Sequence, residues 1–196
     1  MIIRDLAIIV LSFAGFLRFD ELSSLKCNDV TVHDHVLKLK IVHSKTDQYR
    51  QGNDVLISKG NTLACPVSIF RHVSLSKLVL SSDFYIFRPI YRHKGIAKLI
   101  CKNRKISYTT ARENILKKLK SVVPNLNLGL HSLRSGGVSA AASSDVNVRC
   151  IKRHGRWKSD LSKYDYIADT FEKRLSVSQV LDYDFPKFSA LSLCFF

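Results

Sequence analysis

Six side chains spread along the chain together have the chemistry to cleave a phosphodiester without a metal ion: Arg18, Lys45, His131, Arg134, Trp157 and Tyr166. This reaction needs a nucleophile in line with the leaving group, neutralisation of the phosphoryl oxygens, and a proton for the leaving oxygen. The planar guanidinium of arginine matches two phosphate oxygens and stays charged. A partly desolvated lysine can supply the proton, and a tyrosine can attack and store the bond energy in a covalent ester.

Two pairs among these residues are close in sequence. His131 and Arg134 are three residues apart at an expected helix start, which places both side chains on one helix face. Trp157 is the one tryptophan of the chain and precedes Tyr166 by nine residues. Its indole N–H can donate a hydrogen bond to a phosphate oxygen but cannot act as a base. Tyr164 is a rival nucleophile, and residues two apart on a helix point to nearly opposite sides, so only one tyrosine can face the phosphate.

Three of these residues also have a purely structural interpretation. Arg18 could be a helix-capping surface arginine, and Trp157 could be an ordinary core residue. Lys45 could be one of many solvated lysines, and Arg50 could contact phosphate in its place. Lys40 is nearby too, but the alternation of an expected strand explains it as a solvent-facing residue.

In their order and spacing, five segments resemble the tyrosine recombinases, also called phage-type integrases. They are Gly15 to Leu22 around Arg18, Ser44-Lys45-Thr46, His131-Ser132-Leu133-Arg134, Trp157 and Tyr166. The nine-residue spacing is the one that this family shows between its fifth residue, histidine or tryptophan, and its nucleophile. His154 lies twelve residues before Tyr166 and is out of that register. Tryptophan in the fifth position resembles Cre-like members and some eukaryotic mobile-element recombinases.

The resemblance implies an enzyme that cuts and rejoins DNA strands through a 3′-phosphotyrosine. Arg18 and Arg134 would clamp the phosphate with help from Trp157, Lys45 would protonate the leaving 5′ oxygen, His131 would share the proton transfers, and Tyr166 would attack. It implies no metal and no nucleotide cofactor, duplex DNA as the partner, and self-association into a synaptic tetramer. An intracellular location follows, and a nuclear one if the source is eukaryotic.

Two other functions stay open at this stage. The chain could be a catalytically inactive or truncated DNA-binding descendant of a mobile-element recombinase, or a topoisomerase-like relaxer with the same chemistry. Because Arg18 stands so near Met1, the family's N-terminal core-binding domain is expected to be absent. The expected division is therefore a catalytic domain over residues 1–183 and an unassigned apolar tail over residues 184–196.

Composition agrees with a globular protein that binds a polyanion. The 196 residues carry a formal net charge of +15, and the sequence pI is about 9.8, which favours nucleic acid as the partner. The longest apolar run, Leu6 to Leu17, is far shorter than the roughly 20 residues that span a bilayer. Five cysteines without a C-x-x-C pair indicate neither a disulfide framework nor a zinc site, and they favour a reducing intracellular compartment. The pair His33 and His35 lacks a third metal ligand, and no Walker loop occurs.

The expected fold class is mainly α with a small antiparallel β-sheet. Hydrophobic periodicity and capping signals predict the elements. Helices are expected at 3–17, from about 20, at 66–78, after a capping box at 110–113, and at 131–143, 146–154, 159–168 and 171–181. Two strands, 36–42 and 54–58, should form a hairpin whose loop carries Lys45, and residues 84–87 should form a short strand. Gly155 is expected to stop the helix that begins at Val146.

Overall fold

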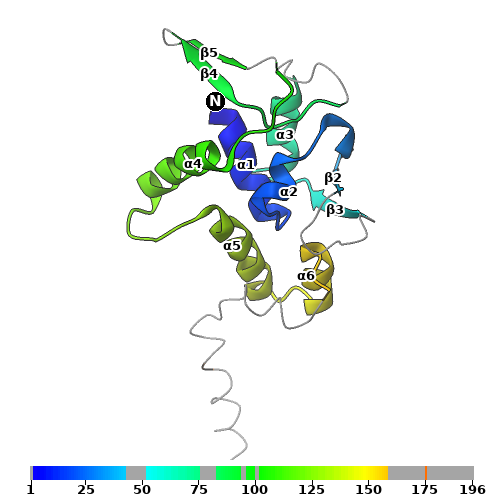
Figure 1. Cartoon of the computed structure of the whole chain (residues 1–196). Helices are drawn as coiled ribbons and strands as arrows, with labels where there is room; N and C mark the ends of the chain where they lie inside the picture. Colours follow the sequence, from blue (N-terminus) through cyan, green and yellow to red (C-terminus); the bar gives the residue numbers. More distant parts are fainter. Residues whose placement is uncertain are drawn as a thin grey trace, which may run out of the picture.

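The computed structural model describes residues 2–42, 52–75, 83–93, 96–99, 102–158 and residue 175. Within these ranges the chain is mainly helical, with two small antiparallel sheets (Figure 1). The helices are α1 (Ile2–Ala14), α2 (Phe19–Ser23), the 3-10 turn η1 (Cys27–Asp29), α3 (Pro66–Leu75), α4 (Tyr108–Val122), α5 (Leu130–Ser143) and α6 (Val148–Gly155). The strands are β1 (Val30–Val32), β2 (Val36–Ile41), β3 (Asn53–Ser58), β4 (Ile90–His93) and β5 (Ile96–Leu99). The predicted fold class is confirmed.

Helix α1 is the centre of the fold, and α3, α4 and α5 pack around it (Figure 1). Ala7, Ile8 and Leu11 are fully buried on its inner face because their spacing repeats every three to four residues. Helix α5 approaches α1 closely at Gly137, where a Cβ atom would lie 2.1 Å from the backbone oxygen of Phe13. Only a residue without a side chain fits there, and this contact brings α5 against the end of α1.

The larger sheet has the order β1-β2-β3, and both pairings are antiparallel. Leu37, Leu39 and Ile41 of β2 are buried in the core, and the alternate residue Lys40 is exposed, as the period of two predicts. The hairpin partners predicted at 36–42 and 54–58 are therefore confirmed. The smaller sheet pairs β4 with β5 and extends to one side of the helices (Figure 1).

Several local predictions were wrong. Residues 84–87 do not form a strand, because Tyr85 makes only an isolated bridge with Lys26. The strands β1, β4 and β5, in contrast, were not predicted. Helix α4 begins two residues before Thr110, and Ser107 caps it by accepting a hydrogen bond from the Thr110 amide. Helix α1 ends at Ala14 rather than near residue 17, since Phe16 adopts a left-handed conformation with φ of 48°.

The helices predicted from about 20, at 131–143 and at 146–154 are confirmed as α2, α5 and α6, although α6 begins at Val148. The remaining predictions of local structure fall outside the described residues, except that residue 175 is helical. They are most of the loop at 43–53, the end of the helix predicted to reach residue 78, the helices at 159–168 and 171–181, and the tail at 184–196. In the described ranges, no helix combines the length and the apolar character required to cross a membrane. Nor do three His, Cys, Asp or Glu side chains gather there in a way that could hold a metal ion.

Candidate active site

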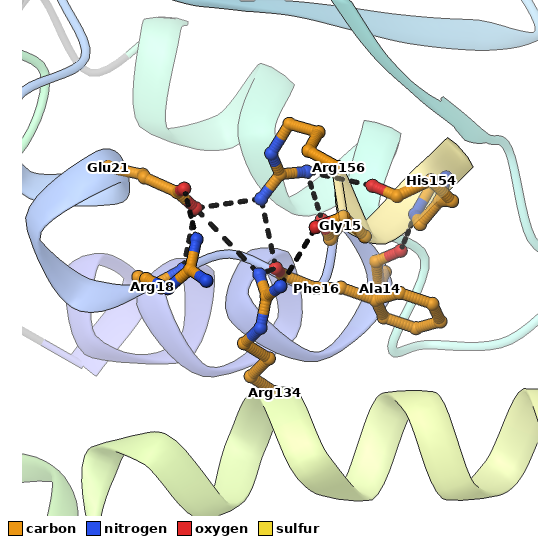
Figure 2. A network of polar contacts seen from close by, with 9 residues as sticks. Ala14, Gly15, Phe16, Arg18, Glu21, Arg134, His154 and Arg156 are labelled. Carbon is orange, nitrogen blue, oxygen red and sulfur yellow. Dashed lines mark hydrogen bonds and ion pairs between the residues drawn. The ribbon is translucent and has the colours of Figure 1, made fainter. Parts of the chain in front are cut away.

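The carboxylate of Glu21 on α2 is the meeting point of three arginines that come from separate parts of the chain (Figure 2). Glu21 is 4% exposed. Its oxygens lie 3.0 Å from Nη1 of Arg18, 2.7 Å from Nη2 of Arg156 and 3.9 Å from Nη1 of Arg134. A buried carboxylate is stable only when it is paired and hydrogen-bonded, and the three guanidinium groups supply both.

Arg18 precedes α2 and is tied to Glu21 twice. Its backbone N–H donates to Glu21 Oε2 at 2.9 Å, and its Nη1 donates to Oε1 at 3.0 Å. The backbone contact satisfies one of the free amides at the start of the helix. The Arg18 side chain is 20% exposed, so Arg18 is the arginine of this group that reaches solvent.

Arg134 rises from α5 toward the turn that follows α1 (Figure 2). Its side chain is fully buried, and its guanidinium donates to the carbonyl oxygen of Phe16 and, at 2.8 Å, to that of Gly155. Its Cζ atom lies 4.6 Å from the centre of the Trp157 ring, which is a cation–π geometry. Arg134 therefore links α2, the turn after α1 and the end of α6.

Arg156 also belongs to this group, and it is a site residue that the sequence did not predict. It ends α6 in the left-handed conformation with φ of 60°, a role that had been predicted for Gly155. Its guanidinium donates to the carbonyl oxygens of Phe16 at 3.0 Å, Gly15 at 3.3 Å and His154 at 2.8 Å, as well as to Glu21. Burial lowers the pKa of Arg156, and the charge of Glu21 opposes that shift. Its position immediately before Trp157 was the one sequence signal that could have drawn attention to it.

Trp157 lies against this arginine cluster and is 6% exposed. Gly155 makes room for it, because a Cβ atom on Gly155 would lie 1.7 Å from Cζ3 of the indole. Phe16 packs beside the indole with ring centres 6.5 Å apart. Trp157 thus belongs to a small core with Phe16, Val138 and Ile151, and it contacts Arg134 at the same time.

The two histidines near the cluster have different environments. His131, in the first turn of α5, is exposed, and its pKa is lowered by partial burial and by the charges of Arg134 and Arg18. His131 is therefore neutral near pH 7 and able to accept a proton. His154 is half-buried, with Nε2 2.8 Å from the carbonyl oxygen of Ala14 and its ring edge-on to Phe16. Burial also lowers the pKa of His154, and these contacts make it a packing residue.

Comparison with known proteins identifies the fold. No model of a protein family matches the sequence. The integrase/recombinase xerD homologue of Selenomonas ruminantium is 30% identical over 171 residues, which are 84% of this chain and 47% of the relative. The chain therefore spans about half the length of that curated relative.

Solved structures agree with this result. XerH site-specific recombinase bound to a palindromic difH substrate has a TM-score of 0.63 at 13% identity, covering 90% of this chain and 44% of XerH. XerA recombinase has a TM-score of 0.62 at 16% identity, covering 87% and 53%. A lambda integrase dimer bound to a COC′ core site has a TM-score of 0.53 at 18% identity, covering 83% and 41%. The fold is that of a tyrosine recombinase catalytic domain. Over most of its length the chain is therefore similar in sequence to one integrase/recombinase and similar in fold to tyrosine recombinases.

On this recombinase fold, four of the six residues singled out from the sequence lie close together. Arg18 and Arg134 share Glu21, Trp157 contacts Arg134, and the charges of both arginines act on His131. Lys45 and Tyr166 lie outside the described residues, as do the rivals Arg50 and Tyr164. Their parts in a reaction remain predictions.

Proposed function

We propose that the chain cleaves and rejoins DNA at specific sites through a covalent 3′-phosphotyrosine intermediate. The observation that carries the proposal is that Arg18 and Arg134 meet at Glu21, that Trp157 packs on Arg134, and that the charges of both arginines act on His131. These residues come from positions 18 to 157, so their proximity is a property of the fold and not of local sequence. Two arginines of this kind are suited to a phosphoryl group that gains charge in the transition state.

The proposed chemistry assigns each proton and bond. The Tyr166 hydroxyl oxygen attacks the phosphorus and forms a phosphotyrosine ester, while the bond from phosphorus to the 5′ oxygen breaks. Lys45 gives a proton to that oxygen, and neutral His131 takes the proton of the tyrosine. Rejoining is the reverse, with the 5′ hydroxyl of a strand as the nucleophile. The lowered pKa of His131 supports its part as a proton acceptor.

The two arginines would enter the reaction differently. Arg18 is partly exposed and needs no rearrangement to meet a phosphate oxygen. Arg134 is fully buried and donates to the carbonyl oxygens of Phe16 and Gly155. To bind a phosphate, Arg134 would exchange at least one carbonyl for a phosphate oxygen, which is a stronger acceptor because it is charged. Trp157, which covers the Arg134 guanidinium, would move with it.

The burial of Arg134 also favours a second function, a DNA-binding protein that keeps the fold but not the reaction. In that case Arg134 is a structural crosslink between α5, the turn after α1 and the end of α6. The partner in both functions is duplex DNA, as the solved XerH and lambda integrase structures contain DNA. This proposal includes assembly into a tetramer and an intracellular location. It also includes the likeness of Trp157 to the tryptophan of Cre-like or eukaryotic members, and a nuclear location rests on this likeness alone.

A nicked suicide duplex separates the two functions. An active chain becomes covalently attached to the DNA and migrates more slowly on a denaturing gel, because the cleaved strand diffuses away before rejoining. Tyr166→Phe should abolish the adduct, and the control Tyr164→Phe should leave it. Absence of adduct with every nicked target that the chain binds supports the inactive descendant. An adduct whose peptide maps to Tyr164 overturns the assignment of the nucleophile.

A further inference from the structure

A pocket of about 610 Å³ opens beside the arginine cluster, between α2, the start of α4 and the start of α5. Arg18 and His131 form one side of it, and Arg104, Lys105, Ser107 and Tyr108 form the other. The rings of Phe19 and Tyr108 meet edge to face at 5.5 Å and give the pocket an apolar wall. The pocket is far larger than one phosphate group requires, and its second side plays no part in the chemistry proposed above.

The second side is held rigidly although it is a loop. Asn103 accepts a hydrogen bond from the Tyr85 amide at 2.9 Å and donates one to the Asp83 carbonyl at 3.2 Å. Three residues later, Ile106 is 1% exposed, and its amide donates to the Phe87 carbonyl at 2.8 Å. Arg104 and Lys105 lie between these two anchors, so the fold fixes their backbone at the edge of the pocket.

The two cations of this edge differ in their partners. Lys105 donates to Asp20 at 3.0 Å and to Ser24 at 3.1 Å. The carboxylate of Asp20, which also lines the pocket, therefore neutralises the charge of Lys105. Arg104 is exposed and makes no ion pair within the described part of the chain. The segment from residue 91 to residue 105 contains six Lys or Arg and no Asp or Glu. Of these six, Arg104 and Lys105 line the pocket, and because Lys105 is paired with Asp20, Arg104 is the cation of this edge that can bind an anion.

We propose that the pocket binds a DNA backbone phosphate next to the one that is cleaved, with Arg104 as its cation. Arg18 and His131 line this pocket and also belong to the proposed reaction site, so a phosphate bound in the pocket lies close to the cleaved one. Because each strand carries one charge per about 3.4 Å of helix axis, the bound group is expected to be a neighbouring phosphate. Arg104 offers a fork of donors to the phosphate, the hydroxyl group of Tyr108 adds a neutral donor, and the apolar wall faces the sugar. The identity of the ligand rests on the proposed function.

The test combines single variants with DNA in which one phosphate at a time is a neutral methylphosphonate. For the unmodified chain, neutralising one phosphate beside the cleavage position should weaken binding about tenfold, as expected for a hydrogen-bonded charge pair. Arg104→Ala should weaken binding to unmodified DNA by a similar factor and make the chain insensitive to that replacement. It should also lower the slope of log affinity against log salt by about 0.9. Arg104→Lys should keep the slope.

The matched control is Arg112→Ala, which removes an exposed arginine on α4 that does not line the pocket. It should retain the sensitivity to the methylphosphonate. If Arg104→Ala and the unmodified chain respond alike at every phosphate, the pocket assignment is wrong, even where the covalent adduct forms. If the coupling at Arg104 is found and no adduct forms, the pocket stands and the catalytic proposal fails.

Discussion

Replacing Glu21 by glutamine tests whether one buried carboxylate holds the arginine cluster together. The amide keeps the size of the side chain but removes the charge that faces Arg18, Arg134 and Arg156. Its NH₂ group is also a donor, and it would face the guanidinium donors. The strongest pair, Glu21 with Arg156, has both side chains 2% exposed, so water cannot replace the lost partner. Removing one member of such a buried pair typically costs about 3–5 kcal/mol of unfolding free energy.

Urea unfolding followed by tryptophan fluorescence measures this change, because Trp157 is the one tryptophan and lies against Arg134. With a slope of about 2 kcal/mol per molar urea, the midpoint should fall by roughly 1.5–2.5 M. The neighbouring Asp20→Asn is the matched control, since Asp20 is 86% exposed and its pair with Lys105 should contribute less than about 1 kcal/mol. If both variants shift the midpoint equally, Glu21 does not anchor the cluster and the argument from its burial is wrong.

Two further predictions concern Trp157 and His131. Gly155→Ala places a methyl group where the indole lies, so we expect a loss of about 1–3 kcal/mol in unfolding free energy and a red-shifted emission. In the control Gly129→Ala, the nearest neighbour of the new methyl group would be 4.0 Å away, so the emission should not change, and the loss of unfolding free energy should stay below about 1 kcal/mol because only the N-cap of α5 is altered. Because burial and the nearby arginines lower the pKa of His131 below its ordinary 6.5, its neutral form persists as the pH falls. Adduct formation in single turnover should therefore lose the contribution of His131 only below pH 6.5, and a loss centred above that pH would contradict a neutral base.

The elements that the sequence predicted well are those whose own pattern is strong. Strand β2 alternates buried Leu37 and Leu39 with lysines, and α1 follows from a long apolar run. The strands that were not predicted, such as β1 and β4, have three and four residues and too little pattern to detect. They form because neighbouring strands and helices fix them, which is tertiary information.

The candidate site shows the same division between local and long-range information. Arg18, His131, Arg134 and Trp157 could be named because their types and spacing match a known order of motifs. The role of Arg156 could not, because it depends on a left-handed backbone that turns the side chain back across the Gly15–Phe16 turn. The cap of α4 was predicted at Thr110 instead of Ser107 for a similar reason. Both residues are suitable capping types, and only the structure shows that Ser107 accepts the hydrogen bond.

The arrangement around Glu21 also explains how a site with three guanidinium groups can fold without its ligand. One carboxylate and the carbonyl oxygens of Gly15, Phe16, His154 and Gly155 accept hydrogen bonds from terminal nitrogens of the guanidinium groups, so part of the positive charge is solvated from within. Three arginines and one glutamate still leave an excess of positive charge close to His131 and the pocket. A phosphate that arrives there meets donors already oriented within a low-dielectric environment, where each contact is stronger than in water. Burial lowers the pKa of His131, and the charges of Arg134 and Arg18 lower it further; the same two charges favour binding of an anion beside it.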